Sequence, residues 1–245
     1  MINIEALFKI SYGIYIISSG DSNKGNGFVS NTVVQVASDP AKLSVCSNKN
    51  NFTAELIQKH GAFSISILSQ ESAPETFGKF GYKSGRDFDK MVGSKIKYGT
   101  TGVPIVLDDA IAYLECKLLQ TIDVGSHLLF IGELLNSDVI DATKEPITYA
   151  YYRQVKKGIS PKNAPTYHKP EIEKPKHEEA TKKYKCVVCS YVYDEATEKT
   201  KFTDLPYNWI CPLCSSEKHV FGETPWLNYN LDILYNSIEY FLFFN

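Results

Sequence analysis

Short apolar runs separated by polar turns dominate the first 153 residues, and their enrichment in Ile, Val, Phe and Tyr predicts β-strands. The predicted strands are 9–18, 27–37, 42–46, 62–68, 110–120, 127–135 and 147–152. Two helices are predicted, at 51–60 between a capping Asn51 and a terminating Gly61, and at 73–80. This many strands with so few helices favours a closed, mainly β barrel.

The pattern changes at residue 154. Residues 154–185 hold four of the eleven prolines and nine lysines against four glutamates, with almost no apolar periodicity. This composition predicts an extended linker, about 90 Å long if about 30 residues adopt polyproline geometry. We therefore divide the chain into a barrel at 1–153, a linker at 154–183, a small domain at 184–225 and an apolar tail at 226–245. The tail has apolar positions on one helical face, which leaves a docked helix and a disordered tail as alternatives.

Two Cys-x-x-Cys pairs mark the small domain, Cys186 with Cys189 and Cys211 with Cys214. Each pair presents two sulfurs on one side of a tight loop, and two such loops complete a tetrahedron of thiolates that suits zinc or iron. Disulfides are the alternative. No secretion signal precedes the cysteines, which favours a metal site.

Aromatic residues around these cysteines narrow the choice of metal. A segment of about 40 residues buries too little surface to fold alone, so metal and large rings must stabilise it. With the cysteines, these rings make residues 183–223 resemble rubredoxin; they are Tyr184, Tyr191, Tyr193, Phe202, Trp209 and Phe221. The resemblance implies one iron that carries a single electron, whereas a structural zinc site does not need these rings.

Two serines depart from the rubredoxin pattern. Rubredoxins usually carry glycine directly after each Cys-x-x-Cys, where the backbone turns left-handed, and here Ser190 and Ser215 stand at these positions. A left-handed residue other than glycine costs about 1–2 kcal/mol. Neither serine removes a ligand, so the prediction of iron stands.

Composition argues against several functions. The 245 residues carry a formal net charge of −2 and show no basic cluster interleaved with aromatics, so we expect no nucleic-acid binding. The longest early apolar run, 14–17, is too short for a signal or a membrane span. We therefore expect a cytoplasmic protein without a membrane span, in which Cys46 and Cys116 stay reduced.

Four strings in the barrel part carry a second resemblance; they are 26–36, 47–53, 84–90 and 125–133. In this order and spacing they resemble the flavin reductase family with the FMN-binding split barrel, over almost all of residues 1–153. The expected fold is thus mainly β, an FMN-binding split β-barrel followed by a small rubredoxin-like metal domain. The family also implies a homodimer formed through the barrel.

The same strings predict an FMN site. A phosphate group binds backbone N–H groups at a helix start, hydroxyl groups and cations, and residues 47–53 offer all three. The resemblance implies that the flavin ring lies against the 31–32 turn, with a histidine beside it. The predicted FMN contacts are Asn31, Thr32, Ser47, Asn48, Lys49, Thr53, Arg86, His127 and Tyr152. A plain helix cap is the alternative for the polar cluster, and core packing is the alternative for Tyr152.

His127 is the predicted catalytic residue, as a hydrogen-bond donor that tunes the flavin ring. No Gly-x-Gly-x-x-Gly motif is present, so we expect NADH or NADPH to bind only transiently on the barrel. The sequence does not distinguish these two nicotinamides.

Together the two resemblances imply an NAD(P)H-dependent oxidoreductase of anaerobes, in which electrons pass through FMN to a rubredoxin iron. The expected acceptor is a flavodiiron protein that reduces O2 or NO, a role in oxidative stress. One alternative is a flavin or ferric reductase that supplies rubrerythrin-type peroxide removal. Another is a flavin-binding scaffold with structural zinc.

Overall fold

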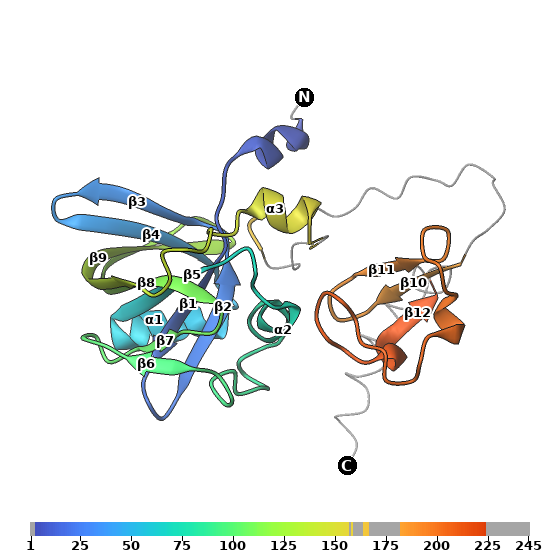
Figure 1. Cartoon of the computed structure of the whole chain (residues 1–245). Coiled ribbons are helices and arrows are strands. Elements are labelled where there is room, and N and C mark those ends of the chain that lie inside the picture. Colours follow the sequence, from blue (N-terminus) through green and yellow to red (C-terminus); the bar gives the residue numbers. More distant parts are fainter. Residues whose placement is uncertain (1–2, 157, 159–163, 167–181, 224–245) are drawn as a thin grey trace, which may run out of the picture. The chain divides into compact units, whose positions relative to one another are not determined.

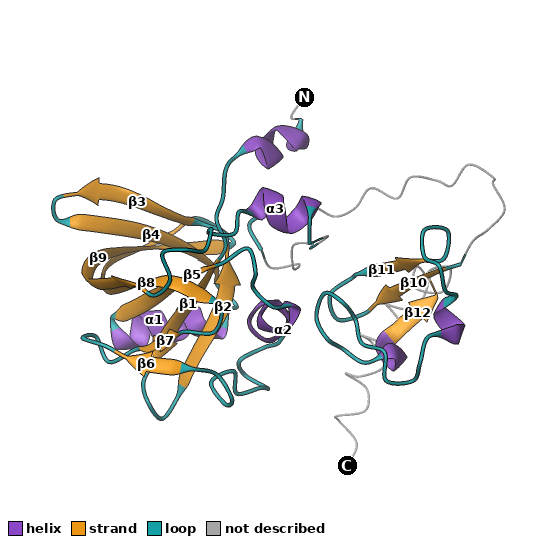
Figure 2. Ribbon diagram, in the orientation of Figure 1, coloured by secondary structure: helices purple, strands orange, loops and turns teal. Residues whose placement is uncertain are grey.

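The computed structural model describes residues 3–156, 158, 164–166 and 182–223. The chain divides into two compact units, Met1–Lys169 and Pro170–Asn245 (Figure 1). Strands are the main element of both units (Figure 2). The apolar tail at 226–245 and most of the predicted linker lie outside the described residues.

A seven-stranded antiparallel sheet forms the first unit. Its strands are β1 (Tyr15–Gly20), β2 (Gly25–Ser30), β3 (Val33–Ser38), β4 (Ala41–Asn48), β5 (Ala62–Leu68), β8 (Ala110–Asp123) and β9 (His127–Val139). The hydrogen-bonded order is β2-β1-β5-β8-β9-β4-β3. β2 and β3 lie at opposite ends of this order, yet only Asn31 and Thr32 connect them. The sheet must therefore curl into a barrel that is split between β2 and β3.

Apolar side chains on the inner face of the curled sheet build its core. Ile17, Val45, Phe63 and Phe130 are fully buried and come from β1, β4, β5 and β9. Helix α1 (Phe52–His60) adds buried residues, including Ile57, to the same cluster. Burying one such side chain contributes about 1.5–3 kcal/mol, so this cluster is the main source of the barrel's stability.

Local signals in the sequence located α1 correctly. The Asn51 side chain accepts a hydrogen bond from the Thr53 N–H at 2.9 Å, which caps the helix start. Gly61 ends the helix with a left-handed φ of 66°, and β5 follows directly. The predicted helix at 51–60 and the predicted strand at 62–68 are both confirmed.

Three predicted strands differ from the structure. The strand predicted at 9–18 begins only at Tyr15, and Lys9 belongs to the 3-10 helix η1 (Ile4–Lys9). The run at 27–37 is two strands, because the chain turns at Asn31 and Thr32. The strand predicted at 147–152 is wrong, since helix α3 (Tyr149–Gln154) lies there. Thr148 caps this helix by accepting a hydrogen bond from the Tyr151 N–H at 3.1 Å. A polar cap therefore outweighed the strand propensity of a tyrosine-rich run.

Short elements complete the first unit. They are the 3-10 helix η1 (Ile4–Lys9), helix α2 (Pro74–Phe77), the π-helix η2 (Gly78–Tyr82) and the hairpin of β6 (Ile96–Tyr98) and β7 (Pro104–Val106). The helix predicted at 73–80 corresponds to α2 and the start of η2. No helix in the described part of the chain is long and apolar enough to cross a membrane.

A buried lysine ties the loop after η2 to the barrel. The Lys90 ammonium donates to the carbonyl oxygen atoms of Gly27 at 2.9 Å and Phe80 at 3.2 Å. Burial lowers the pKa of Lys90 to about 8. These two bonds hold residues 83–90, which carry Arg86, close to β2.

The described part of the second unit, residues 182–223, has a three-stranded sheet and two short helices. They are β10 (Lys183–Cys186), β11 (Val192–Asp194), β12 (Phe221–Glu223), η3 (Phe202–Asp204) and η4 (Lys218–Val220), with strand order β11-β10-β12. Tyr184 stacks on Phe202 with 4.3 Å between ring centroids, and Trp209 meets Phe202 edge-on at 5.7 Å. The aromatic core predicted from the sequence is present, and it is too small to hold the unit together without further cross-links.

The first unit continues past residue 153. Lys156 donates from Nζ to the Ser72 carbonyl at 2.9 Å, and the Gly158 N–H donates to the Tyr152 carbonyl at 2.9 Å. Residues 164–166 also contact the barrel. These described residues of the predicted linker therefore pack on the first unit.

Candidate functional site

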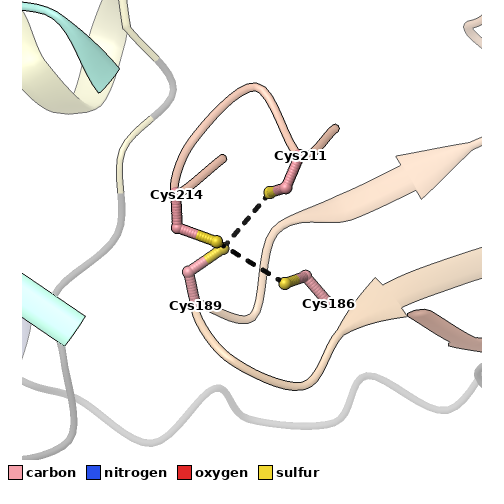
Figure 3. Close-up of side chains that lie close together, drawn as sticks. All are labelled: Cys186, Cys189, Cys211 and Cys214. Carbon is pink, nitrogen blue, oxygen red and sulfur yellow. Dashed lines mark hydrogen bonds between the residues drawn. The ribbon is translucent and has the colours of Figure 1, made fainter. Parts of the chain in front are cut away.

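The four cysteine sulfurs of the second unit converge on one point (Figure 3). All four side chains are buried, and their sulfurs lie within 4.8 Å of one another. The Sγ–Sγ distance is 3.8 Å for Cys186 and Cys214, and 3.5 Å for Cys189 and Cys211. Metal–sulfur bonds of about 2.3 Å at tetrahedral angles require sulfurs about 3.8 Å apart. The four thiols therefore fit one tetrahedral ion.

Two loops with the same backbone hydrogen bonding hold these cysteines. The first cysteine of each pair donates its N–H to the carbonyl oxygen five residues later, at 2.8 Å for both Cys186 and Cys211. The residue after each pair is left-handed, with φ of 64° at Ser190 and 57° at Ser215. The left-handed geometry predicted for these serines is thus present.

A pocket of about 490 Å³ lies at one end of β4 and β9 in the first unit. Cys46 and Asn48 line it from β4, while Val124, Ser126 and His127 line it from the β8–β9 turn and the start of β9. Asn48 and His127 are directly paired in the β4–β9 ladder. The volume lies within the range of small-molecule sites. Two residues that belong to the predicted linker, at 164 and 165, form another part of the wall.

The β2–β3 turn borders this pocket through Cys46. The Cys46 N–H donates to the Thr32 carbonyl at 3.3 Å, and the Thr32 hydroxyl donates to the Cys46 carbonyl at 3.4 Å. Burial raises the pKa of the Cys46 thiol, which therefore stays neutral at physiological pH. The two turn residues predicted to meet the flavin ring, Asn31 and Thr32, thus lie beside the pocket.

Lys49 follows the lining residue Asn48 and is bonded through its backbone to a second lining residue, Ser126. Its Nζ lies 2.6 Å from Asp123 Oδ2, and its N–H donates to the Ser126 carbonyl at 3.2 Å. Ser47, two residues earlier, is buried and donates from Oγ to the Asn48 carbonyl at 3.4 Å. Lys49 therefore places a cationic side chain next to two residues of the pocket wall, Asn48 and Ser126.

Most backbone N–H groups at the start of α1 already have acceptors within the protein. The Asn50 N–H donates to Asn48 Oδ1 at 2.9 Å, and the Asn51 N–H donates to the Asn48 carbonyl at 3.0 Å. Asn51 in turn accepts from the N–H groups of Thr53 and Ala54. Because these backbone N–H groups already have acceptors, a phosphate group bound near the start of α1 would be contacted mainly by side chains.

Thr53, Arg86 and Tyr152 lie apart from the pocket lining. Thr53 is fully buried, and its hydroxyl accepts a hydrogen bond from Asn26 Nδ2 at 2.8 Å. Arg86 forms an ion pair with Glu55 on α1. Tyr152 is buried on α3, 4.8 Å from the Phe77 ring by centroid, with its hydroxyl 3.3 Å from that of Tyr82. These contacts agree with core packing for Tyr152, the alternative weighed above.

The structure thus gathers one part of the predicted FMN site. The predicted residues at or beside the pocket are Asn31, Thr32, Ser47, Asn48, Lys49 and His127. Sequence reasoning missed Cys46, Val124, Ser126 and the segment 164–166. Ser126 carried a usable signal in the sequence, because it directly precedes His127; in the structure its Oγ lies 2.8 Å from His127 Nδ1.

Comparisons with known proteins identify both units. The family described as "Flavin reductase like domain" matches residues 7–160, and the rubredoxin family matches residues 183–221. The chain is 43% identical over 227 residues to a high molecular weight rubredoxin of Moorella thermoacetica, covering 89% of this chain and 98% of the relative. This chain belongs to the high molecular weight rubredoxin family. As such, it is an oxidoreductase that combines a flavin reductase domain with a rubredoxin domain.

Two further similarities concern the flavin reductase domain alone. A ferric-chelate reductase (NAD(P)H) of Archaeoglobus fulgidus is 41% identical over 165 residues, covering 67% of this chain and 97% of the relative. The solved structure of an FMN-binding protein from Thermus thermophilus with bound 1-cyclohex-2-enone is similar with a TM-score of 0.51 and 25% identity. That similarity covers 56% of this chain and 78% of the other.

The observed sites suit the cofactors of a high molecular weight rubredoxin. Four buried thiols at tetrahedral spacing provide the ligand set of a rubredoxin iron. The pocket of about 490 Å³ has mostly apolar walls with a few polar groups, among them Asn48, Ser126 and His127, which suits a flavin in size and chemistry. The protein therefore uses a flavin and an iron held by the four cysteine thiolates.

Proposed function

We propose that this protein carries electrons from NADH or NADPH, through FMN in the first unit and iron in the second, to an external acceptor. The observation that carries the proposal is the presence, in one chain, of the His127 pocket and the four-cysteine site. A bound flavin exchanges two electrons with a nicotinamide and releases them one at a time, which a single iron requires.

Within this proposal, the residues around the pocket have separate tasks. Asn31 and Thr32 form the polar edge against which the flavin ring lies, and His127 donates a hydrogen bond to it. Lys49 binds the phosphate group as a cation held in place by Asp123, 2.6 Å away. Arg86 is likewise held in an ion pair, with Glu55, but it lies apart from the pocket lining, so we assign it a smaller part.

The proposed acceptor is a flavodiiron protein, and its support is the resemblance to fused flavin reductase–rubredoxins of anaerobes. The rubredoxin unit offers acidic side chains for docking on a basic surface of such an acceptor; they are Asp194, Glu195, Glu198 and Asp204. Glu198 and Asp204 are exposed, whereas Asp194 pairs with Lys183 and Glu195 accepts a hydrogen bond from the Phe202 N–H. Association through the exposed charges weakens as salt rises, because they are screened.

We also propose that the protein is a homodimer through the barrel. The edge strand β3 exposes Val34 and Val36, and β8 and β9 expose Leu119 and Leu135. Side chains of this kind on a barrel surface suit a second copy of the chain. Association would also shield a flavin ring from water, since ligand sites favour interfaces.

A second activity, reduction of a ferric chelate, is supported by one specific observation. The relative from Archaeoglobus fulgidus carries that activity in its name and matches the flavin reductase domain over 97% of its length. If this protein shares the activity, a variant without the iron site will still reduce ferric citrate with NADH.

The experiment that tests the main proposal is anaerobic reduction of the full chain, loaded with FMN and iron. NADH and NADPH are added in separate samples, and bleaching of the visible iron–thiolate absorption is followed by stopped flow. We expect bleaching to require FMN and at least one nicotinamide. A purified flavodiiron protein with O2 or NO should then restore the colour.

Three outcomes would contradict parts of the proposal. Full zinc occupancy without a visible absorption band would remove iron from the scheme. Iron reduction at the same rate without FMN would remove the flavin, whereas reduced iron that persists with flavodiiron protein would remove only this acceptor.

A further inference from the structure

Residues 164–166, here called the strap, lie on the barrel at the predicted flavin site although composition assigns them to the linker. Ala164 and Pro165 line the same pocket as Asn48 and His127. Proline has no backbone N–H and little conformational freedom, so it suits a fixed wall. The strap is therefore part of the pocket.

The hydroxyl group of Thr166 fixes the strap to two other elements. Asn31 on the β2–β3 turn donates from Nδ2 to Thr166 Oγ1 at 3.0 Å. Thr166 Oγ1 in turn donates to the hydroxyl oxygen of Tyr149, on α3, at 3.3 Å. One hydroxyl group thus acts as acceptor and donor at once, and it links the β2–β3 turn to α3.

The bond to Thr166 also orients Asn31. The Asn31 side chain is buried, and a buried amide is costly to leave without partners. With its nitrogen bound to Thr166, the amide is held in one of its two flipped orientations. Its carbonyl oxygen then has a fixed direction relative to the turn, which a group that contacts a flavin ring requires.

We propose that the strap is the outer wall of the flavin pocket, and that Thr166 is a positioning residue which orients Asn31 for the flavin ring. This inference rests on the proposed flavin site. It adds residues outside the four strings that suggested that site, and it gives a stretch of the predicted linker a role in cofactor binding.

The test uses the full chain loaded with iron, with FMN as the probe. Thr166→Val keeps the shape of the side chain but removes both hydrogen bonds, whereas Thr166→Ser keeps the hydroxyl group. Thr203→Val, in the second unit, is the matched control, because the Thr203 side chain is exposed and bonds only to Asp204 among the described residues. FMN affinity and dissociation rate are measured by the change in flavin fluorescence.

We expect Thr166→Val to weaken FMN binding about fivefold to tenfold, as loss of a hydrogen-bond partner does, mainly through faster dissociation. Thr166→Ser and Thr203→Val should bind FMN as the unaltered protein does. All three variants should keep the melting temperature of the first unit and the visible iron absorption. A purely structural role for Thr166 would instead lower that melting temperature.

A double variant separates positioning from simple contact. If Thr166 acts through Asn31, then Thr166→Val should change FMN affinity much less in an Asn31→Ala background than alone. Equal FMN affinity and dissociation rate in Thr166→Val and the unaltered protein would reject the proposed role of Thr166 but leave the proposed flavin site intact. If the unaltered protein binds no FMN, both the proposed function and the proposed role of the strap are rejected.

Discussion

Ser190 and Ser215 occupy equivalent points of the two cysteine loops. Each donates its N–H to the carbonyl of the cysteine four residues earlier, Ser190 to Cys186 at 2.8 Å and Ser215 to Cys211 at 2.9 Å. Each also has a left-handed φ, at 64° and 57°. The two loops therefore store the same kind of backbone strain beside the metal ligands.

Ser190→Gly should stabilise the rubredoxin unit by about 1 kcal/mol, because glycine relieves the left-handed strain while adding some freedom to the unfolded chain. The measurement is the midpoint of thermal or denaturant-induced loss of the visible iron absorption. Ser190→Ala is the matched control and should give no gain, since alanine keeps a Cβ atom. A midpoint that is unchanged in Ser190→Gly would show that Ser190 carries no strain.

Cys211→Ala should abolish iron binding and unfold the rubredoxin unit, since its aromatic cluster is too small to replace the metal. The flavin reductase unit has a separate core, so NADH-driven FMN reduction should continue. Metal content and near-UV circular dichroism report the first effect. Cys116→Ala, in the barrel core, should keep full iron content, and iron retained by Cys211→Ala would contradict the four-thiolate site.

Lys49→Ala should weaken FMN binding about tenfold and leave riboflavin binding unchanged, because only FMN carries the phosphate that we propose the ammonium contacts. Titration of the apoprotein with each flavin measures the two affinities. Lys42→Ala, on β4, which ends just before Lys49, and away from the pocket lining, is the control. Equal losses for FMN and riboflavin would move the phosphate contact to another residue.

Glu115→Gln should destabilise the barrel by about 3 kcal/mol near neutral pH. Glu115 is fully buried and accepts hydrogen bonds from Thr100, Thr101 and Asn136, so a glutamine amide would face donors with its own N–H groups. Denaturant unfolding followed by far-UV circular dichroism measures the loss. Glu71→Gln, at an exposed ion pair with Lys144, should change stability little.

The same carboxylate predicts how barrel stability depends on pH. Burial acts to raise the pKa of Glu115, but hydrogen bonds from Asn136, Thr101 and Thr100 outweigh it, and the pKa lies below its ordinary value. The stability that Glu115 contributes is therefore complete above its ordinary pKa and is lost as pH falls through the folded-state pKa. The gap between the unaltered protein and Glu115→Gln should shrink in acid. A gap that stays constant from neutral pH into strong acid would contradict this.

Val36→Lys should convert the proposed homodimer to a monomer, because it puts a charge on the exposed face of the edge strand β3. Light scattering after size-exclusion chromatography measures the mass. Val92 is exposed at 70% against 51% for Val36, so Val92→Lys is a matched control that should stay dimeric. A monomer before any substitution would reject the dimer.

Sequence reasoning succeeded where the deciding interactions are local. Asn51 and Gly61 bound α1 because capping depends on residues within one turn, and the spacing of the cysteines identified a complete metal site. It failed at Tyr149–Gln154, which forms a helix whose buried Tyr152 packs against Phe77, a residue distant in the chain. Tertiary contacts of this kind override propensity and leave no periodic pattern.

The flavin site was only partly predictable for the same reason. Residues 47–53 formed a recognisable polar cluster, but the contacts of Arg86 with Glu55 and of Thr53 with Asn26 depend on the folded barrel. Thr166 left no signal, since its partner Asn31 is distant in the chain. Glu115 likewise stands in an apolar run, and nothing beside it in sequence indicated a buried carboxylate that binds the 99–102 turn.

The hydrogen bonds of Thr166 also shorten the covalent path, the stretch of chain that links the two cofactor sites. Bonds at Lys156, Gly158 and Thr166 keep the described chain on the first unit, so that path starts at Thr166 and not at Gln154. For the flexible linker that the composition predicts, the local concentration of a tethered domain falls roughly as the −3/2 power of linker length, so we expect the shorter path to raise it about twofold. We therefore expect the anchoring of the chain at Lys156, Gly158 and Thr166 to raise the rate at which the iron and the flavin meet.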